Sequence, residues 1–186
     1  MTTPALLIID MMNRFDYPGG DRLARRSVET LPAILRLRAR FDELGLPVIY
    51  ANDNFTDWHA DFGRLVEACR AQGGESGRIA TELAPRPDHY YLLKPKHSAF
   101  LGTPLEILLS QLKVEQLVLT GIATDSCILA TAQDGHMRDL GIAIPADATE
   151  AQTEGRKTQT LALLRTSLGA RVETSAGVVQ TLEVWR

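Results

Sequence analysis

Residues 121–127, GIATDSC, connect an apolar run to a segment with helical periodicity. The run, residues 117–120, is typical of a buried strand, so Cys127 is expected in the first turn of a helix, just beyond a strand end. Backbone N–H groups there have no intrahelical partner and carry the positive end of the helix dipole. We therefore expect the thiolate form of Cys127 to be favoured and the same N–H groups to hold a substrate oxyanion.

Outward from this turn, apolar runs rich in β-branched residues alternate with amphipathic stretches along the whole chain. The runs predict six strands, over residues 5–9, 47–51, 89–93, 116–120, 142–144 and 170–174. The stretches predict helices over residues 21–44, 61–71, 103–112, 125–140 and 153–168. We expect a break or a new helix start at Pro32, a surface excursion over residues 73–88, and a tail or short helix over residues 178–186.

Strands that alternate with helices favour a parallel sheet with right-handed crossovers, and near-continuous apolar strands favour a sheet covered on both faces. We therefore predict a three-layer α/β/α fold. No repeat, low-complexity tract or linker interrupts the pattern, so residues 1–186 are expected to form one domain. Ligands of such sheets bind beyond the carboxyl ends of the strands. Asp10, Lys94 and Cys127 all belong to that rim, because each ends or follows a predicted strand.

Composition narrows the classes of partner and compartment. The chain has 186 residues, of which 45% are hydrophobic and 23% charged, as in ordinary globular proteins. Its net charge is −3 and it has no basic run, which argues against nucleic acid and membrane surfaces as partners. The two cysteines, Cys69 and Cys127, are typical of a reduced cytosolic protein, and the start of the chain resembles neither a leader nor a membrane span. We expect a cytoplasmic location.

The three rim residues together permit acyl transfer. A cysteine nucleophile needs a group that removes its proton, and it needs positive charge nearby. Asp10 has the chemistry to accept that proton, and Lys94 to keep Asp10 ionised. Each residue also has a structural interpretation: Asp10 as a turn cap, Lys94 as a solvated strand end and Cys127 as a filler of the core.

Three segments resemble the isochorismatase-like cysteine hydrolases, which include nicotinamidases, N-carbamoylsarcosine and ureidoacrylate amidohydrolases, and isochorismatase. They are residues 6–15 (LLIIDMMNRF), 94–100 (KPKHSAF) and 121–127 (GIATDSC). The resemblance implies a six-stranded parallel sheet with the order 3-2-1-4-5-6. It also implies that Asp10, Lys94 and Cys127 are the catalytic residues, and that the substrate is a small molecule.

The resemblance carries two further implications about the site and one about assembly. The peptide bond between Ile122 and Ala123 is implied to be cis, with the N–H groups of Ala123 and Cys127 forming the oxyanion hole. Members of the family are commonly oligomeric, so a homo-oligomer, either a dimer or a tetramer, is expected.

The chain also departs from the family pattern. Met12 and Arg14 stand where the opening segment usually has Gln and Asp, which implies a different pocket shape. Related nicotinamidases carry metal ligands after the second strand. Asp53 matches one of them, but Phe55 occupies the first histidine position and leaves only His59 nearby. One carboxylate and one imidazole do not make a three-ligand site, so we predict no bound metal or other cofactor, and nicotinamidase activity is disfavoured.

Aromatic and imidazole side chains near the rim are candidates for contact with the substrate. They are Phe15, Phe55, Trp58, His59, His97 and Phe100. His97 has two interpretations, a second acid–base group or a wall of the pocket, and the often aromatic residue at the matching family position favours the wall. Cys69, His89 and His136 are interpreted as structural or exposed.

Three functions remain in view. The first is a metal-independent hydrolase that cleaves an amide or ureide C–N bond through a thioester on Cys127. The second keeps the fold but cleaves a vinyl ether, with Asp10 as the acid and no attack by the thiol. The third is non-catalytic, either ligand binding or redox sensing at Cys127. The full Asp/Lys/Cys set favours the first.

Overall fold

The computed structural model describes residues 3–59 and 61–182. Along the chain these form β1 (Thr3–Ile9), α1 (Gly20–Glu43), β2 (Val48–Asp53), α2 (Phe62–Gln72), α3 (Gly74–Leu83), β3 (Tyr90–Lys94), α4 (Leu105–Gln111), β4 (Val114–Ile122), a π-helical turn (Thr124–Ile128), α5 (Leu129–His136), β5 (Gly141–Pro145), a 3₁₀ turn (Ala146–Ala148), β6 (Thr149–Glu150), α6 (Glu154–Leu168), β7 (Arg171–Glu173) and α7 (Ser175–Leu182). None of the helices in this part of the chain has the length and apolar composition needed to cross a bilayer.

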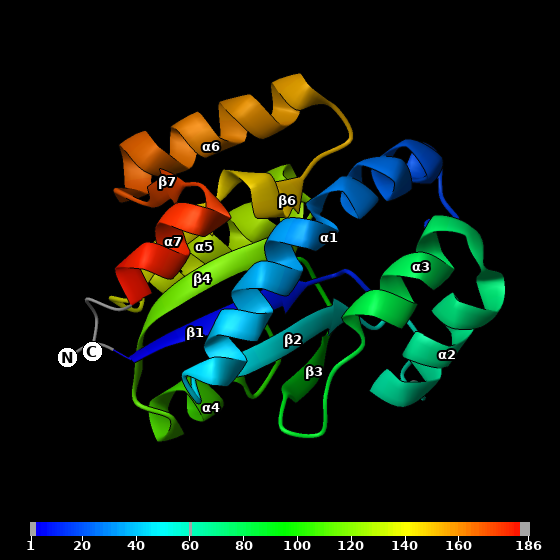
Figure 1. The fold of residues 1–186 in the computed structure, drawn as a ribbon, viewed down its shortest axis with the longest axis horizontal. Coiled ribbons are helices and arrows are strands. Elements are labelled where there is room, and N and C mark those ends of the chain that lie inside the picture. Colours follow the sequence, from blue (N-terminus) through cyan, green and yellow to red (C-terminus); the bar gives the residue numbers. More distant parts are fainter. Residues whose placement is uncertain (1–2, 60, 183–186) are drawn as a thin grey trace.

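All paired strands run parallel, in the order β3-β2-β1-β4-β5-β7. The six predicted strands correspond to these six, so the predicted order 3-2-1-4-5-6 is confirmed. The two-residue strand β6 was not predicted, and it pairs with the end of β4. The strand order reverses between the neighbouring strands β1 and β4 (Figure 1). Sheets of this kind bind ligands beyond the carboxyl ends of the strands at such a point.

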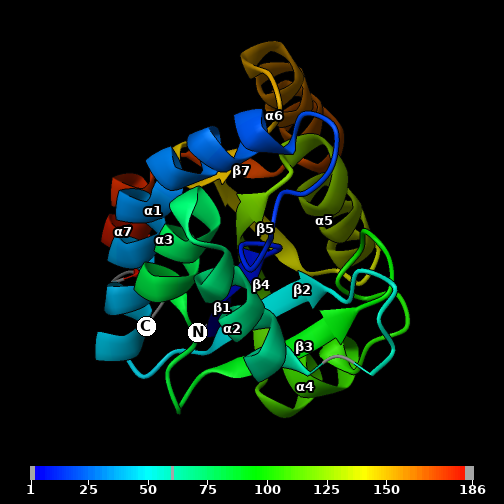
Figure 2. The ribbon, with the colours of Figure 1, turned by 90° about the vertical axis from the view of Figure 1, so that its right-hand side faces the viewer.

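Helices cover both faces of the sheet, which gives the predicted three layers (Figure 2). Alternate residues of β1 face opposite layers: Leu6 and Ile8 pack with α1, α3 and α7, whereas Leu7 and Ile9 pack with α4, α5 and α6. A strand buried on both sides has no polar face, which is why its sequence reads as a continuous apolar run.

Two local predictions were wrong. Helix α1 continues through Pro32, because Pro32 lies on the exposed side, where the carbonyl group that loses its backbone donor is open to water. Residues 73–88 are not an irregular excursion, since they contain α3. Gly73 and Gly74, both with positive φ, reverse the chain between α2 and α3, and Ile79 then packs into the core.

Gly121 makes the closest backbone approach near the site. It has φ +103°, and a Cβ there would lie 2.0 Å from the carbonyl oxygen of Ile9. We expect Gly121→Ala to lose more than about 4 kcal/mol of unfolding free energy in urea denaturation, because β1 and β4 would have to separate. The control is Gly155→Ala on α6, where an added Cβ meets nothing within 4 Å, with an expected change within about 1 kcal/mol. Wild-type stability of Gly121→Ala would contradict this packing.

Candidate active site

Asp10, Lys94 and Cys127 lie together beyond the carboxyl ends of β1, β3 and β4. The ammonium Nζ of Lys94 is 2.8 Å from Asp10 Oδ2 and 3.5 Å from Cys127 Sγ. Lys94 is the last residue of β3, and β2 lies between β3 and β1. The Lys94 side chain therefore spans the width of β2 to reach Asp10. The three residue types that the sequence placed on one rim therefore form one contact cluster.

The carboxylate of Asp10 is held by contacts on both of its oxygens. Asp10 follows β1 with φ +54°, and its Oδ1 accepts a 2.6 Å hydrogen bond from the backbone N–H of Asp53 at the end of β2. Oδ2 faces Lys94. Burial raises the pKa of Asp10 above its ordinary value, and the positive charge of Lys94 offsets only part of that rise. A raised pKa makes this carboxylate a stronger proton acceptor.

Lys94 is 0% exposed, yet it stays charged. Burial by itself would lower its pKa, but the interactions with the groups around it, above all the negative charge of Asp10 and the hydrogen bond to it, outweigh burial, so the pKa is raised. Its Nζ also donates to the carbonyl oxygen of Lys96 at 3.2 Å and lies 3.7 Å from Asp53 Oδ2. The ammonium group is therefore fixed between two carboxylates and the sulfur.

Cys127 lies in the π-helical turn that follows the cis peptide bond between Ile122 and Ala123. Burial and the neighbouring charge of Asp10 raise the pKa of the thiol to about 12, against a smaller lowering by Lys94. The expectation that a helix start favours the thiolate was wrong here. Burial and the charge of Asp10 raise the pKa of the thiol by more than the helix N-terminus lowers it. The resting site holds a thiol beside a group suited to take its proton.

This pKa is open to direct measurement. We expect the ultraviolet absorbance of the Cys127 thiolate, taken as wild type minus Cys127→Ala, to stay absent at neutral pH and to rise only toward pH 12. A thiol at the ordinary value of 9.0 would be ionised about 10³-fold more at pH 8, since the two pKa values differ by about 3. Thiolate absorbance that reaches its plateau near pH 7 would contradict the assignment.

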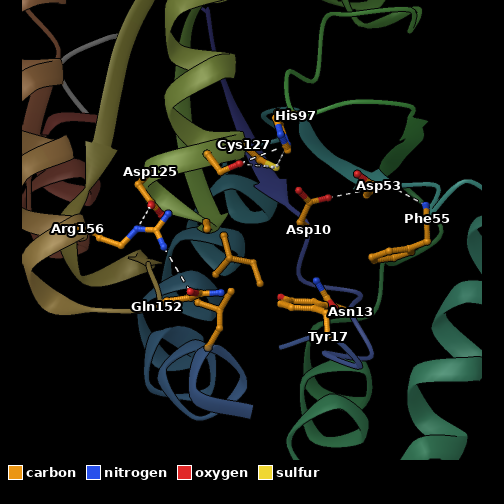
Figure 3. A pocket seen from close by; sticks show the side chains of 14 residues that line it. Asp10, Asn13, Tyr17, Asp53, Phe55, His97, Asp125, Cys127, Gln152 and Arg156 are labelled. Carbon is orange, nitrogen blue, oxygen red and sulfur yellow. Dashed lines mark hydrogen bonds and ion pairs between the residues drawn. The ribbon is translucent and has the colours of Figure 1, made fainter. Parts of the chain in front are cut away.

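A cavity of about 330 Å³ opens above the cluster. Phe55 and His97, which the sequence named as substrate contacts, line it, as do Ala123, Asp10 and Cys127 (Figure 3). His97 and Asp10 lie near the Cys127 sulfur, and Phe55 supplies an aromatic surface at one side. The volume suits a small molecule.

Four predicted substrate contacts do not line this cavity. Phe15 and Phe100 are buried in the two layers of the core, where Phe100 also packs under the guanidinium of Arg138. Trp58 is 79% exposed and the His59 side chain 98% exposed, on the loop between β2 and α2. These four residues are therefore not substrate contacts in this structure. Phe15 and Phe100 pack in the core, and Trp58 and His59 are exposed to solvent on a polar loop.

Several lining residues escaped the sequence interpretation. They are Asn13, Tyr17, Asp125, Ser126, Gln152 and Arg156. Arg156 forms an ion pair with Asp125, and its Nη1 lies 3.3 Å from Gln152 Oε1. Gln152 and Arg156 follow the short strand β6, whose carboxyl end meets the same rim. Recognition of residues 149–150 as a strand would have indicated them.

A partly buried ion cluster holds this part of the rim in place. The carboxylate of Glu150, at the end of β6, contacts Arg26 Nη2 at 2.5 Å and Lys157 Nζ at 2.6 Å. Arg26 also pairs with Glu154 at 2.7 Å. The cluster joins α1, β6 and α6, and so fixes the segment that brings Arg156 to the cavity.

The candidate metal ligands have other surroundings. Asp53 Oδ1 accepts the N–H of Phe55 at 2.6 Å, and Oδ2 faces Lys94. Within residues 3–59 and 61–182, no group of three or more His, Cys, Asp or Glu side chains is placed to hold a metal ion. Metal independence remains a prediction that metal analysis of the purified protein tests.

Fold and site together define the class of isochorismatase-like hydrolases, and comparison with known proteins agrees. The family model described as the isochorismatase domain matches residues 4–177. The uncharacterized isochorismatase family protein YaaI of Bacillus subtilis is 36% identical over 176 residues, covering 95% of this chain and 96% of the relative. The chain belongs to the isochorismatase family and is a hydrolase of that family.

Two further similarities concern relatives with named activities. A ureidoacrylate amidohydrolase, RutB of Methylobacterium radiotolerans, is 30% identical over 207 residues, covering 95% of this chain and 80% of the relative. The crystal structure of N-carbamoylsarcosine amidase from Thermoplasma acidophilum superposes with a TM-score of 0.71 at 26% identity, covering 94% of this chain and 97% of that one.

Proposed function

We propose that this protein hydrolyses a C–N bond of a small amide or ureide, without a metal, through a thioester on Cys127. One observation carries the proposal: a buried ammonium group, Lys94 Nζ, lies 2.8 Å from a carboxylate and 3.5 Å from a thiol at the floor of a small cavity. A nucleophile, a proton acceptor and a fixed positive charge are the parts that acyl transfer to sulfur requires.

In the first half of the reaction, Asp10 accepts the proton of the Cys127 thiol while the sulfur attacks the substrate carbonyl carbon. The carbonyl electrons move onto oxygen as the C–S bond forms. Asp10 then gives the proton to the departing nitrogen, the C–N bond breaks, and an amine or ammonia leaves. The high pKa of Cys127 requires such a base, because almost no thiolate is present at neutral pH.

Lys94 acts through charge. Its ammonium group stabilises Asp10 as a carboxylate before proton transfer and stabilises the developing negative charge on sulfur during attack. The N–H groups of Ala123 and Cys127 are proposed to receive the oxyanion, and their place in the cavity-lining turn supports this role. In the second half, water cleaves the thioester, which releases the carboxylic acid and restores the thiol.

The relatives support amide-type chemistry over vinyl-ether cleavage. Ureidoacrylate amidohydrolase and N-carbamoylsarcosine amidase are named for C–N hydrolysis of small molecules, and the chain resembles both over most of its length. A vinyl ether needs only an acid. Cleavage of a vinyl ether would therefore leave no role for the Cys127 sulfur, which lies beside Asp10 and contacts the ammonium group of Lys94.

A substrate panel tests this proposal. We would measure release of ammonia or amine from ureidoacrylate, N-carbamoylsarcosine and simple amides, and loss of a vinyl ether such as isochorismate, each with wild type and Cys127→Ala. We expect turnover of at least one amide or ureide that depends on Cys127. Cleavage of the vinyl ether with no C–N substrate accepted, or turnover that survives in the variant, would contradict the proposal.

We also propose that the protein forms a homo-oligomer. Large apolar side chains on the surface support this, among them Tyr91 at the sheet edge, Ile107 on α4 and Met137 after α5, each more than half exposed. Light scattering at micromolar concentration is expected to report a mass above that of one chain, and a monomer at all concentrations would contradict it.

A further inference from the structure

His97 makes a contact with the nucleophile that the proposed steps do not use. Its Nδ1 lies 3.7 Å from Cys127 Sγ and 3.3 Å from the hydroxyl oxygen of Ser126. The residue is exposed and lines the cavity, three positions after Lys94 in the chain. Figure 3 shows His97 and Asp10 reaching the sulfur from different directions. The site therefore holds two groups able to move protons beside one sulfur.

These two groups differ in their access to water. Asp10 is 5% exposed, and both of its oxygens are engaged, Oδ1 by the Asp53 N–H and Oδ2 by Lys94. It lies beside the thiol at the floor, where it is suited to the proton of the thiol. His97 is exposed, so a water molecule reaches its ring from solvent without displacing an ion pair. This difference favours Asp10 for proton transfer from the thiol and His97 for proton transfer from a water molecule.

We propose that His97 is the catalytic base for the water that hydrolyses the thioester, an inference that rests on the proposed function. A water that donates to Nδ1 at about 2.8 Å lies within reach of a carbonyl carbon bonded to a sulfur 3.7 Å from the same nitrogen. The hydroxyl of Ser126 limits the rotation of the ring. The role needs the nitrogen that faces the sulfur, whereas a pocket wall would need only the face of a ring.

The step balances as follows. The water oxygen bonds to the thioester carbon, and Nδ1 of His97 takes one water proton. The tetrahedral intermediate then collapses, the C–S bond breaks with its electron pair on sulfur, and the imidazolium returns the proton to Cys127. The product is a carboxylic acid, and the site regains its neutral imidazole and its thiol. Asp10 and Lys94 serve the acylation half in this division.

An activated acyl donor separates the two halves. p-Nitrophenyl acetate acylates a nucleophile without needing a proton for its leaving group, so the rapid burst of p-nitrophenolate reports acylation and the later steady rate reports hydrolysis of the thioester. His97→Gln keeps a hydrogen-bonding side chain but cannot take up a proton. We expect it to retain the burst, to lower the steady rate about 10²-fold or more, and to accumulate an acetyl adduct on Cys127 in intact-mass spectra.

The control is His136→Gln, an exposed histidine on α5 that does not line the cavity, for which we expect both phases to match wild type. Equal steady rates for His97→Gln and wild type would overturn this inference and leave the proposed function intact. Loss of the burst in His97→Gln would also overturn it, by placing His97 in acylation. Release of p-nitrophenolate with no Cys127 adduct in either the wild type or His97→Gln would overturn the proposed function first, and this inference with it.

Discussion

Cys127→Ala is expected to lower kcat for the best amide substrate by about 10⁴-fold or more while the fold is kept. The reason is that a thioester needs a sulfur nucleophile, and Cys127 is the one cysteine among the described residues that line the cavity. The thiol is small, so its loss, which leaves a methyl side chain, should change the free energy of unfolding by no more than about 1 kcal/mol. Steady-state kinetics and urea denaturation measure the two effects separately.

Cys69→Ala is the matched control. Cys69 is the other free cysteine, and it lies in the core on α2, away from the residues that line the cavity. We expect this variant to keep the wild-type kcat. Covalent catalysis by Cys127 would be refuted by a Cys127→Ala protein that turns over substrate at an undiminished rate.

Lys94→Met is expected to cost about 3 to 5 kcal/mol of unfolding free energy at neutral pH, together with activity. Removal of the ammonium group leaves the carboxylate of Asp10 buried without its partner. Without Lys94, the folded-state pKa of Asp10 rises further above that of the unfolded chain. The variant should therefore be relatively more stable at acid pH, where Asp10 is protonated, and should lose that stability as pH rises through the folded-state pKa.

A second substitution separates charge from packing. Asp10→Asn combined with Lys94→Met removes both charges, so we expect the double variant to recover a large part of the lost stability while remaining inactive. Urea denaturation of the wild type, both single variants and the double variant gives the coupling energy. Additive losses would show that the ion pair is not what holds these two side chains together.

The parallel strands and the Asp/Lys/Cys cluster were predictable from the residues themselves for a simple physical reason, whereas the order of the strands was implied by the resemblance to the family. Strands buried on both faces appear as continuous apolar runs, and a polar residue that ends such a run must lie at the carboxyl rim. Asp10 follows β1 and Lys94 ends β3, as this rule requires, and Cys127 lies in the turn that follows β4. Parallel pairing then brings the ends of β1, β3 and β4 to one edge.

What could not be predicted depends on contacts distant in sequence. Strand β6 has only two residues, which is too short to give a periodic pattern in the sequence. Gln152 and Arg156, which follow it, were therefore not predicted as residues of the site. The direction of an aromatic side chain near the rim is set by packing, which buries Phe15 and leaves Phe55 in the cavity. The pKa of Cys127 is raised by burial beside Asp10, whereas its position at the start of a helix alone predicted a lowered pKa.

Mass spectrometry of the protein quenched during turnover tests the central claim most directly. With a C–N substrate from the panel, the account predicts an added mass equal to the acyl fragment, mapped to the peptide that contains Cys127 and absent from Cys127→Ala. Rapid turnover at saturating substrate with no acyl group on Cys127 at any quench time, or with an acyl group on another residue, would contradict it.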